Sequence, residues 1–112
     1  MIFVTGPRFS GKRAYIKERF QLSEEAFASR TAVEVQSLAA GKNLADLEAL
    51  AGQLSEKDFV TASETGCGVV PADPEERADR EAAGRLACLL AEKADAVIRM
   101  CCGIPEVLKG KV

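Results

Sequence analysis

The sequence of 112 residues contains no histidine and no tryptophan, and aromatic residues make up only 5% of it. Without histidine, the chain cannot use a Ser-His or Cys-His pair or any histidine base. Its apolar runs are far too short to cross a bilayer, so we expect no membrane association. Lys and Arg number 15 against 17 Asp and Glu, and a net charge of −2 offers no basic surface for nucleic acid. Ordinary charged and apolar fractions predict a single globular domain over 1–112.

The four cysteines form no recognisable metal motif. No C-x-x-C pair occurs, and Cys101 and Cys102 are adjacent, while Cys67 and Cys88 stand alone. Two adjacent thiols make convergence on zinc awkward, so buried thiols in a reducing compartment are the simpler interpretation. The apolar stretch at the N-terminus is short and ends in glycine, unlike a signal peptide. We therefore expect a cytoplasmic protein.

A glycine loop near the N-terminus is the most informative feature that the sequence does contain. Ile2, Phe3 and Val4 predict a short buried strand, and the segment that follows, Gly6-Pro7-Arg8-Phe9-Ser10-Gly11-Lys12, fits the phosphate-binding pattern G-x-x-x-x-G-K. The glycines let backbone N–H groups point at phosphate oxygens, and Lys12 can reach the β- and γ-phosphates from the start of a helix. The expected nucleotide-binding residues are Gly6, Pro7, Arg8, Phe9, Ser10, Gly11, Lys12 and Arg13. The alternative is a strand, turn and helix start that bind nothing.

The part of this motif that binds metal is incomplete. Where the pattern has Ser or Thr, whose hydroxyl holds Mg²⁺, this chain has Arg13, which is cationic and has no acceptor atom. Arg13 could instead offset phosphate charge. A second acid often ends a neighbouring strand in such proteins, but Gln36 lies near that point. Glu34 is an alternative that could equally face solvent. The sequence therefore argues against Mg²⁺ held in the usual way.

Helical patterns recur along the chain. Helices are predicted over 12–21, over 43–54 with Asn43 as N-cap, and over 73–93 with Asp73 as N-cap and proline next. Ser23 could cap a further short turn. Four leucines are predicted to face the core from the second of these helices: Leu44, Leu47, Leu50 and Leu54. In the last helix the inner face is formed by Ala83, Leu86, Leu90 and Ala94.

Strands are predicted over 31–37, 58–62 and 94–102, in addition to the N-terminal one, and residues 106–112 read as a partly packed tail. Strands that alternate with helices predict an α/β fold with a parallel sheet of about four strands and helices on both faces.

Two further groups of residues are candidates for binding or chemistry. Glu64 lies in the loop 63–71, which follows a predicted strand and contains two glycines, a common ligand position in open α/β sheets. It is the candidate acid or metal partner, and the alternative is an exposed glutamate in a structural turn. Arg77 and Arg80 could contact phosphate or a partner, or could form surface pairs with Glu76 and Glu81.

Several segments together resemble one family, the bifunctional adenosylcobinamide kinases/adenosylcobinamide-phosphate guanylyltransferases of cobalamin biosynthesis. The segment Met1–Lys12 looks like the N-terminus of that family, and Val60-Thr-Ala-Ser-Glu-Thr-Gly-Cys-Gly-Val-Val-Pro71 is similar to its V-(T/S)-N-E-V-G-x-G-(I/V)-V-P. The spacing from Arg77 to Arg85 resembles R-x-x-R-D-x-A-G-R, and Gly103–Gly110 is similar to G-(L/I)-P-x-x-L-K-G. These segments cover roughly half of the chain in the order of the family.

The resemblance implies a P-loop (RecA-like) fold, a homotrimer, and an enzyme that phosphorylates adenosylcobinamide and then transfers GMP through a histidine. GTP or ATP is the implied nucleotide, with Lys12 and Glu64 as catalytic residues. This chain departs from the family by lacking several dozen residues, including the segment with that histidine, and has Ser63 where the family has Asn. Guanylyl transfer through histidine is therefore not expected. The alternative is a degenerate, non-catalytic regulatory or interaction protein that binds nucleotide or corrinoid.

Overall fold

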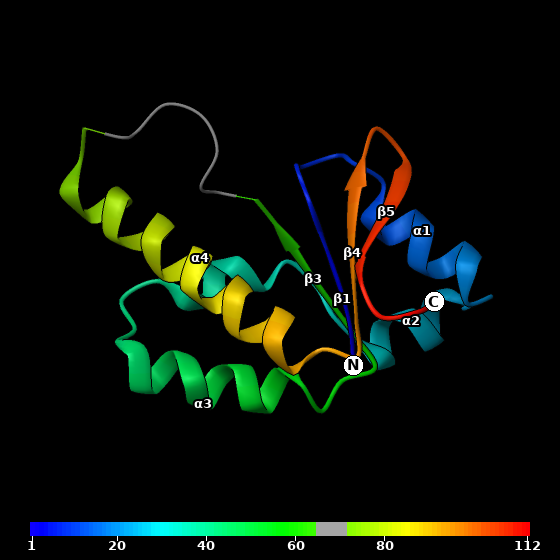
Figure 1. The fold of residues 1–112 in the computed structure, drawn as a ribbon, viewed down its shortest axis with the longest axis horizontal. Helices are drawn as coiled ribbons and strands as arrows, with labels where there is room; N and C mark the ends of the chain where they lie inside the picture. The colour runs from blue at the N-terminus through cyan, green and yellow to red at the C-terminus, as the bar shows by residue number, and fades with distance from the viewer. Residues whose placement is uncertain (65–71) are drawn as a thin grey trace.

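A mixed sheet organises the part of the chain that the computed structural model describes, residues 1–64 and 72–112. Over these residues it has five strands in the order β2-β3-β1-β4-β5 (Figure 1). The first four are parallel, and β5 runs antiparallel to β4. Their bounds are β1 Ile2–Gly6, β2 Thr31–Ala32, β3 Phe59–Ser63, β4 Ala96–Cys101 and β5 Ile104–Lys109.

Helices cover both faces of this sheet, which gives three layers (Figure 1). On one side lie α3 and α4 with the 3₁₀ helix η1, and on the other lie α1 and α2. Because side chains alternate along a strand, Phe3 of β1 packs with the first group and Val4 with the second. The bounds are α1 Lys12–Arg19, α2 Glu24–Arg30, η1 Val35–Ala39, α3 Leu44–Leu54 and α4 Pro74–Lys93. The predicted α/β class is confirmed.

The best-capped helices begin where the sequence predicts. The Asp73 carboxylate accepts a hydrogen bond from the Glu75 N–H at 3.0 Å, and α4 ends at Lys93 as expected. The predicted inner face of α4 is buried. Asn43 caps α3 in the same way, through the Asp46 N–H at 2.9 Å. The prediction that Leu44 faces the core is wrong. This residue, in the first turn of α3, is 51% exposed and lines a groove between α3 and α4.

Three boundaries differ from the predictions. The first helix stops at Arg19 because Gln21 takes a left-handed φ of 53°. The predicted strand 31–37 is reduced to Thr31–Ala32, since the chain turns at Glu34 and continues as η1. The predicted tail 106–112 lies partly in β5, Ile104–Lys109, an edge strand whose residues are all exposed.

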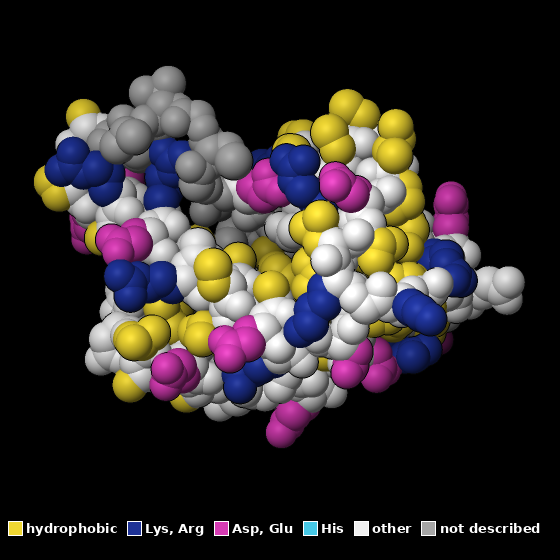
Figure 2. Space-filling model, in the orientation of Figure 1, with side chains coloured by type: hydrophobic (Ala, Val, Ile, Leu, Met, Phe, Trp, Pro, Cys, Tyr) yellow, Lys and Arg dark blue, Asp and Glu magenta, His cyan; other side chains and the backbone are white. Residues whose placement is uncertain are grey.

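The prediction that the cysteines are buried is wrong for the three that the structure describes. Cys88 lies on the outer side of α4, and Cys101 and Cys102 lie at the β4–β5 turn, all exposed. Cys67 lies outside the described residues. Figure 2 shows apolar side chains gathered over the β4–β5 hairpin, where Ile104, Val107 and Leu108 are more than half exposed. None of the described helices could span a membrane.

Candidate functional site

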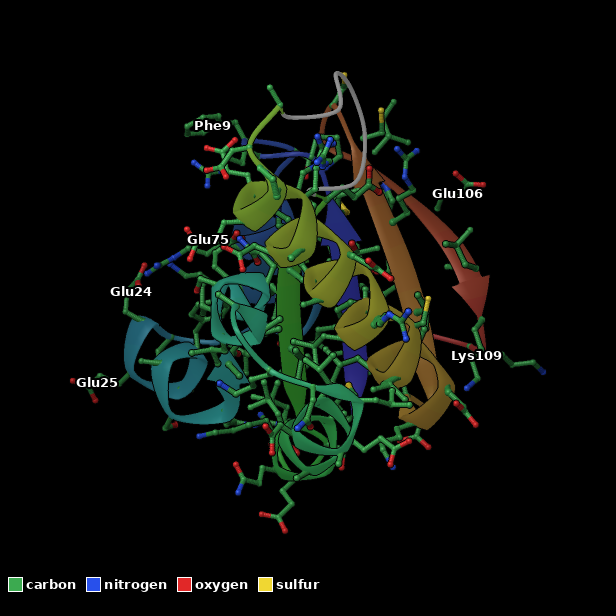
Figure 3. All side chains as sticks on the ribbon, turned by 90° about the vertical axis from the view of Figure 1, so that its left-hand side faces the viewer. Phe9, Glu24, Glu25, Glu75, Glu106 and Lys109 are labelled. Carbon is green, nitrogen blue, oxygen red and sulfur yellow. The ribbon has the colours of Figure 1, made fainter. Side chains whose placement is uncertain are left out.

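The glycine loop joins the end of β1 to the start of α1 through two backbone conformations that favour glycine. Gly6 has a φ of +151°, and a Cβ there would lie 2.4 Å from the carbonyl oxygen of Met100. Gly11 has a φ of +94° and forms the N-cap of α1. Together they place the N-terminus of α1 at the carboxyl edge of the parallel strands. Phe9, at the tip of the loop, projects fully into solvent (Figure 3).

Lys12 lies across this loop although its side chain is only 6% exposed. Its ammonium donates hydrogen bonds to the carbonyl oxygens of Pro7 at 2.9 Å and Gly6 at 3.4 Å. It also donates to the Ser63 hydroxyl at 3.2 Å. A buried cation costs free energy unless it is paired. The loop carbonyls, Ser63 and one carboxylate provide the pairing here.

That carboxylate belongs to Glu34, whose Oε1 lies 3.7 Å from the Lys12 ammonium. Its Oε2 accepts hydrogen bonds from the Ser63 hydroxyl at 2.5 Å and from the Gln36 amide at 2.9 Å. Burial acts to raise the pKa of Glu34, but these hydrogen bonds and the attraction of Lys12 outweigh it, so the pKa is lowered. Glu34 is therefore an ionised, half-buried carboxylate beside Lys12.

The backbone of Glu34 is held in an uncommon conformation. Its φ of 53° is left-handed, which is unfavourable for a residue other than glycine, and its N–H donates to the Thr61 hydroxyl at 3.0 Å. The neighbouring Gln36 uses its amide oxygen to accept the Ser63 N–H at 3.0 Å. Glu34, the candidate acid, and Gln36, which stands near the expected position of the second acid, thus lie in one network with Lys12.

Glu64, the acid nominated from the sequence, has a different partner. Its two carboxylate oxygens accept hydrogen bonds from the Arg99 guanidinium at 2.7 and 3.1 Å, and this contact raises the pKa of Arg99. Glu64 follows β3 and Arg99 lies on β4, so the pair spans the β1 strand between them. Sequence reasoning missed Arg99 and Thr61, since only the strand order brings them to this edge.

Arg13 turns away from the loop toward α2. Its guanidinium lies 2.6 Å from the Glu24 carboxylate and 4.9 Å from the centre of the Phe27 ring. Arg13 thus contacts a carboxylate and an aromatic ring of α2, and it also lines the hollow beside the loop.

The residues around Lys12 do not fit a Mg²⁺ ion held in the usual way. No hydroxyl follows Lys12, one carboxylate is within reach, and two oxygens that could help, those of Ser63 and Gln36, are already hydrogen-bonded. Among the residues that the structure describes, no group of three acidic or cysteine ligands converges.

One buried hydroxyl in the loop has no partner within the described residues. Ser10 is 4% exposed, and its Oγ makes no hydrogen bond, although its carbonyl accepts the Gly103 N–H at 2.9 Å. Buried hydroxyls are usually paired. An unpaired one beside the N-terminus of α1 lies where a ligand oxygen could bind.

Three adjoining hollows surround these groups. The first, which we call the loop hollow, has a volume of about 470 Å³ and lies against Ser10–Ala14, Val33 and Thr61. The second, the central hollow, measures about 490 Å³ and shares Phe9, Lys12 and Glu34 with it. The third, the arginine hollow, measures about 330 Å³ and is lined by Arg8, Gln36, Ser37, Ala40, Asp79, Arg80 and Ala83.

Comparison with known families decides the relationship of the chain. The model of one family, cobinamide kinase / cobinamide phosphate guanyltransferase, matches residues 22–108. The chain belongs to this family. The resemblance noted from the sequence is thus confirmed, and with it the P-loop α/β fold class of the family. The glycine loop precedes the matched residues, so its role rests on its own sequence and geometry. A search of curated proteins found no match.

Proposed function

We propose that this member of the cobinamide kinase / cobinamide phosphate guanyltransferase family binds a nucleoside triphosphate, GTP or ATP, over the Gly6–Lys12 loop. It transfers the terminal phosphoryl group to the hydroxyl of cobinamide. The observation that carries the proposal is that one loop holds both a buried Lys12 and a buried Ser10 hydroxyl, which has no hydrogen-bond partner among the described residues, at the N-terminus of an eight-residue helix. Phosphate oxygens satisfy both groups at once.

Each group has a role in this chemistry. Without a ligand, the ammonium of Lys12 donates to the carbonyl oxygens of Gly6 and Pro7 and to the Ser63 hydroxyl. A triphosphate replaces these acceptors with anionic oxygens, which bind an ammonium more strongly. Charge on the transferred phosphoryl group is then stabilised by Lys12 and by the N–H groups at the start of α1. Guanylyl transfer through a histidine has no residue to carry it in this sequence.

A second function, nucleotide binding without transfer, is favoured by one observation. Arg13 stands in place of the hydroxyl that normally binds metal and is engaged with α2. A kinase must bind its nucleotide better with Mg²⁺, whereas a loop of this kind can be indifferent to the ion. Dependence on Mg²⁺ therefore separates the two functions.

Calorimetric titration of GTP and ATP into the purified protein, with and without Mg²⁺, tests both functions. Lys12→Met, which keeps the packed stem, is expected to weaken nucleotide binding by about 10–100-fold through loss of a charge-assisted contact. Lys93→Met, a substitution of an exposed residue at the C-terminal end of α4, is the control and should bind nucleotide as the wild type does. Absence of binding to either nucleotide would overturn the proposal.

A further inference from the structure

Phe9 differs from every other phenylalanine of the chain in its surroundings. Its side chain is 103% exposed at the tip of the glycine loop (Figure 3), whereas the other four are buried or partly buried: Phe3, Phe20, Phe27 and Phe59. Phe9 also takes a left-handed φ of 60°, which is unfavourable for a bulky side chain. Strain of this kind gathers at sites that bind ligands, so a strained and fully exposed ring indicates a binding role.

The two hollows that Phe9 borders differ in character. The central hollow surrounds the ring with polar or charged side chains, those of Arg8, Lys12, Glu34, Gln36, Ser37 and Ser63. The loop hollow also contains polar groups, but it brings Phe9 together with two exposed apolar residues, Ala14 and Val33. Val33 is 46% exposed. Apolar surface for a ligand beside Phe9 therefore lies in the loop hollow.

This apolar surface is continuous with the groups that are proposed to hold phosphate. Ser10, Gly11 and Lys12 line the same hollow as Phe9 and Val33. Its volume of about 470 Å³ lies within the range of sites for small molecules. Inorganic phosphate would leave the ring of Phe9 in water, and a purely apolar molecule would leave Ser10 and Lys12 without anionic partners. The occupant that suits both parts carries a phosphate chain and a flat apolar group in one molecule.

We infer that the loop hollow holds the base of the bound nucleotide and that Phe9 stacks on this base, with Val33 as a second apolar contact. The inference rests on the proposed function and deepens it, since it names the part of the site that binds the base. Phe9 is a binding residue here and takes no part in bond formation. Every base presents a π face, so stacking on Phe9 contributes to the binding of both GTP and ATP.

The contribution of Phe9 is tested by calorimetry with three probes: GTP, ATP and inorganic tripolyphosphate, which carries the phosphate chain without a base. Phe9→Ala should weaken the binding of GTP and ATP by about 5–100-fold, because stacking on the base is lost. Tripolyphosphate should bind wild type and Phe9→Ala equally. Leu108→Ala, which changes an exposed apolar residue on β5, is the matched control and should bind all three probes as the wild type does.

Fluorescence reports the stacking directly, because the sequence contains no tryptophan. Phe9→Trp introduces a single indole, whose emission should be quenched by GTP and ATP and left unchanged by tripolyphosphate. Leu108→Trp places the indole on β5 instead, and its emission should respond to none of the three. Equal changes in the emission of Phe9→Trp with GTP and with tripolyphosphate would mean that no base lies on the ring.

The calorimetric outcomes separate this inference from the proposed function. Equal affinity of wild type and Phe9→Ala for GTP would overturn the stacking and leave phosphate binding at the loop intact. Equal losses of affinity for GTP and tripolyphosphate in Phe9→Ala would overturn it too, since Phe9 would then act through the conformation of the loop. Failure of the proposed function has a different signature, because the wild type would bind neither nucleotide nor tripolyphosphate, and that result would overturn both.

Discussion

Two glutamates at the carboxyl edge of the sheet differ sharply in their surroundings. Glu34, just beyond β2, faces Lys12 and is fixed by Ser63, Gln36 and a left-handed backbone. Glu64, just beyond β3, gives both carboxylate oxygens to Arg99. The residue type and the position at a strand end are the same. What differs is the cation each one meets, and only that of Glu34 lies in the glycine loop.

This difference assigns a different physical role to each carboxylate. A carboxylate held bidentately by arginine has little capacity left for another ligand and mainly ties β3 to β4. One with an oxygen open to a hollow can act on a molecule there. The sequence nominates Glu64 because this residue follows a strand and precedes two glycines. Such a local pattern carries no information about Arg99, the partner of Glu64 on β4.

The largest expected effect comes from Gly6, which supports both regions. Its carbonyl accepts the Glu64 N–H at 2.9 Å and lies 3.4 Å from the Lys12 ammonium. In Gly6→Ala the new Cβ would meet the Met100 carbonyl at 2.4 Å, and φ is +151°. We expect the free energy of unfolding in urea to fall by at least about 2 kcal/mol, from backbone strain and the clash together.

Gly52→Ala is the matched control for this change. Gly52 lies within α3, and a Cβ there meets nothing within 4 Å. The substitution should raise the free energy of unfolding by about 0.5–1 kcal/mol because alanine favours the helix. If both variants unfold at the same urea concentration as the wild type, Gly6 does not lie as close to the Met100 carbonyl as the structure places it.

A smaller effect is expected from Glu64→Gln, which sharpens the contrast with Glu34→Gln. Loss of the partly exposed pair with Arg99 should lower the melting temperature by less than about 4 °C. Phosphoryl transfer to cobinamide distinguishes the two glutamates. A loss confined to Glu34→Gln assigns the acid to Glu34, and a loss confined to Glu64→Gln returns it to the residue nominated from the sequence.

Local signals explain why much of the fold is predictable from sequence. Asp73 and Pro74 at the start of α4, and the Asn43 cap of α3, act within one helical turn. Their effects therefore depend only on residues that are close in the sequence. The glycine loop is equally local, and Gly6 and Gly11 take the conformations that the pattern requires. These features need no knowledge of distant contacts.

The features that sequence reasoning missed depend on distant partners. The alternation from Thr31 to Ser37 favours a strand, yet the Thr61 hydroxyl holds the Glu34 N–H and the chain turns into η1. The last strand, β5, is defined by pairing with β4 rather than by a buried face of its own. The network around Lys12 likewise joins residues 51 positions apart, Lys12 and Ser63.

The smallest predicted effect is the dependence of stability on pH that Glu34 contributes. Its folded pKa lies below the ordinary value of 4.5, so its contribution is complete above about pH 4.5 and is lost as pH falls through the lower folded pKa. Because Glu34 is 42% exposed, we expect less than about 1 kcal/mol. The difference in free energy of unfolding between wild type and Glu34→Gln, measured from pH 7 to 3, isolates it. Asp95, whose pKa is lowered by its hydrogen bond to the terminal ammonium, titrates in both proteins and cancels. A difference that stays constant to pH 3 would mean that Ser63, Gln36 and Lys12 do not hold the ionised carboxylate, and the contrast with Glu64 would lose its basis.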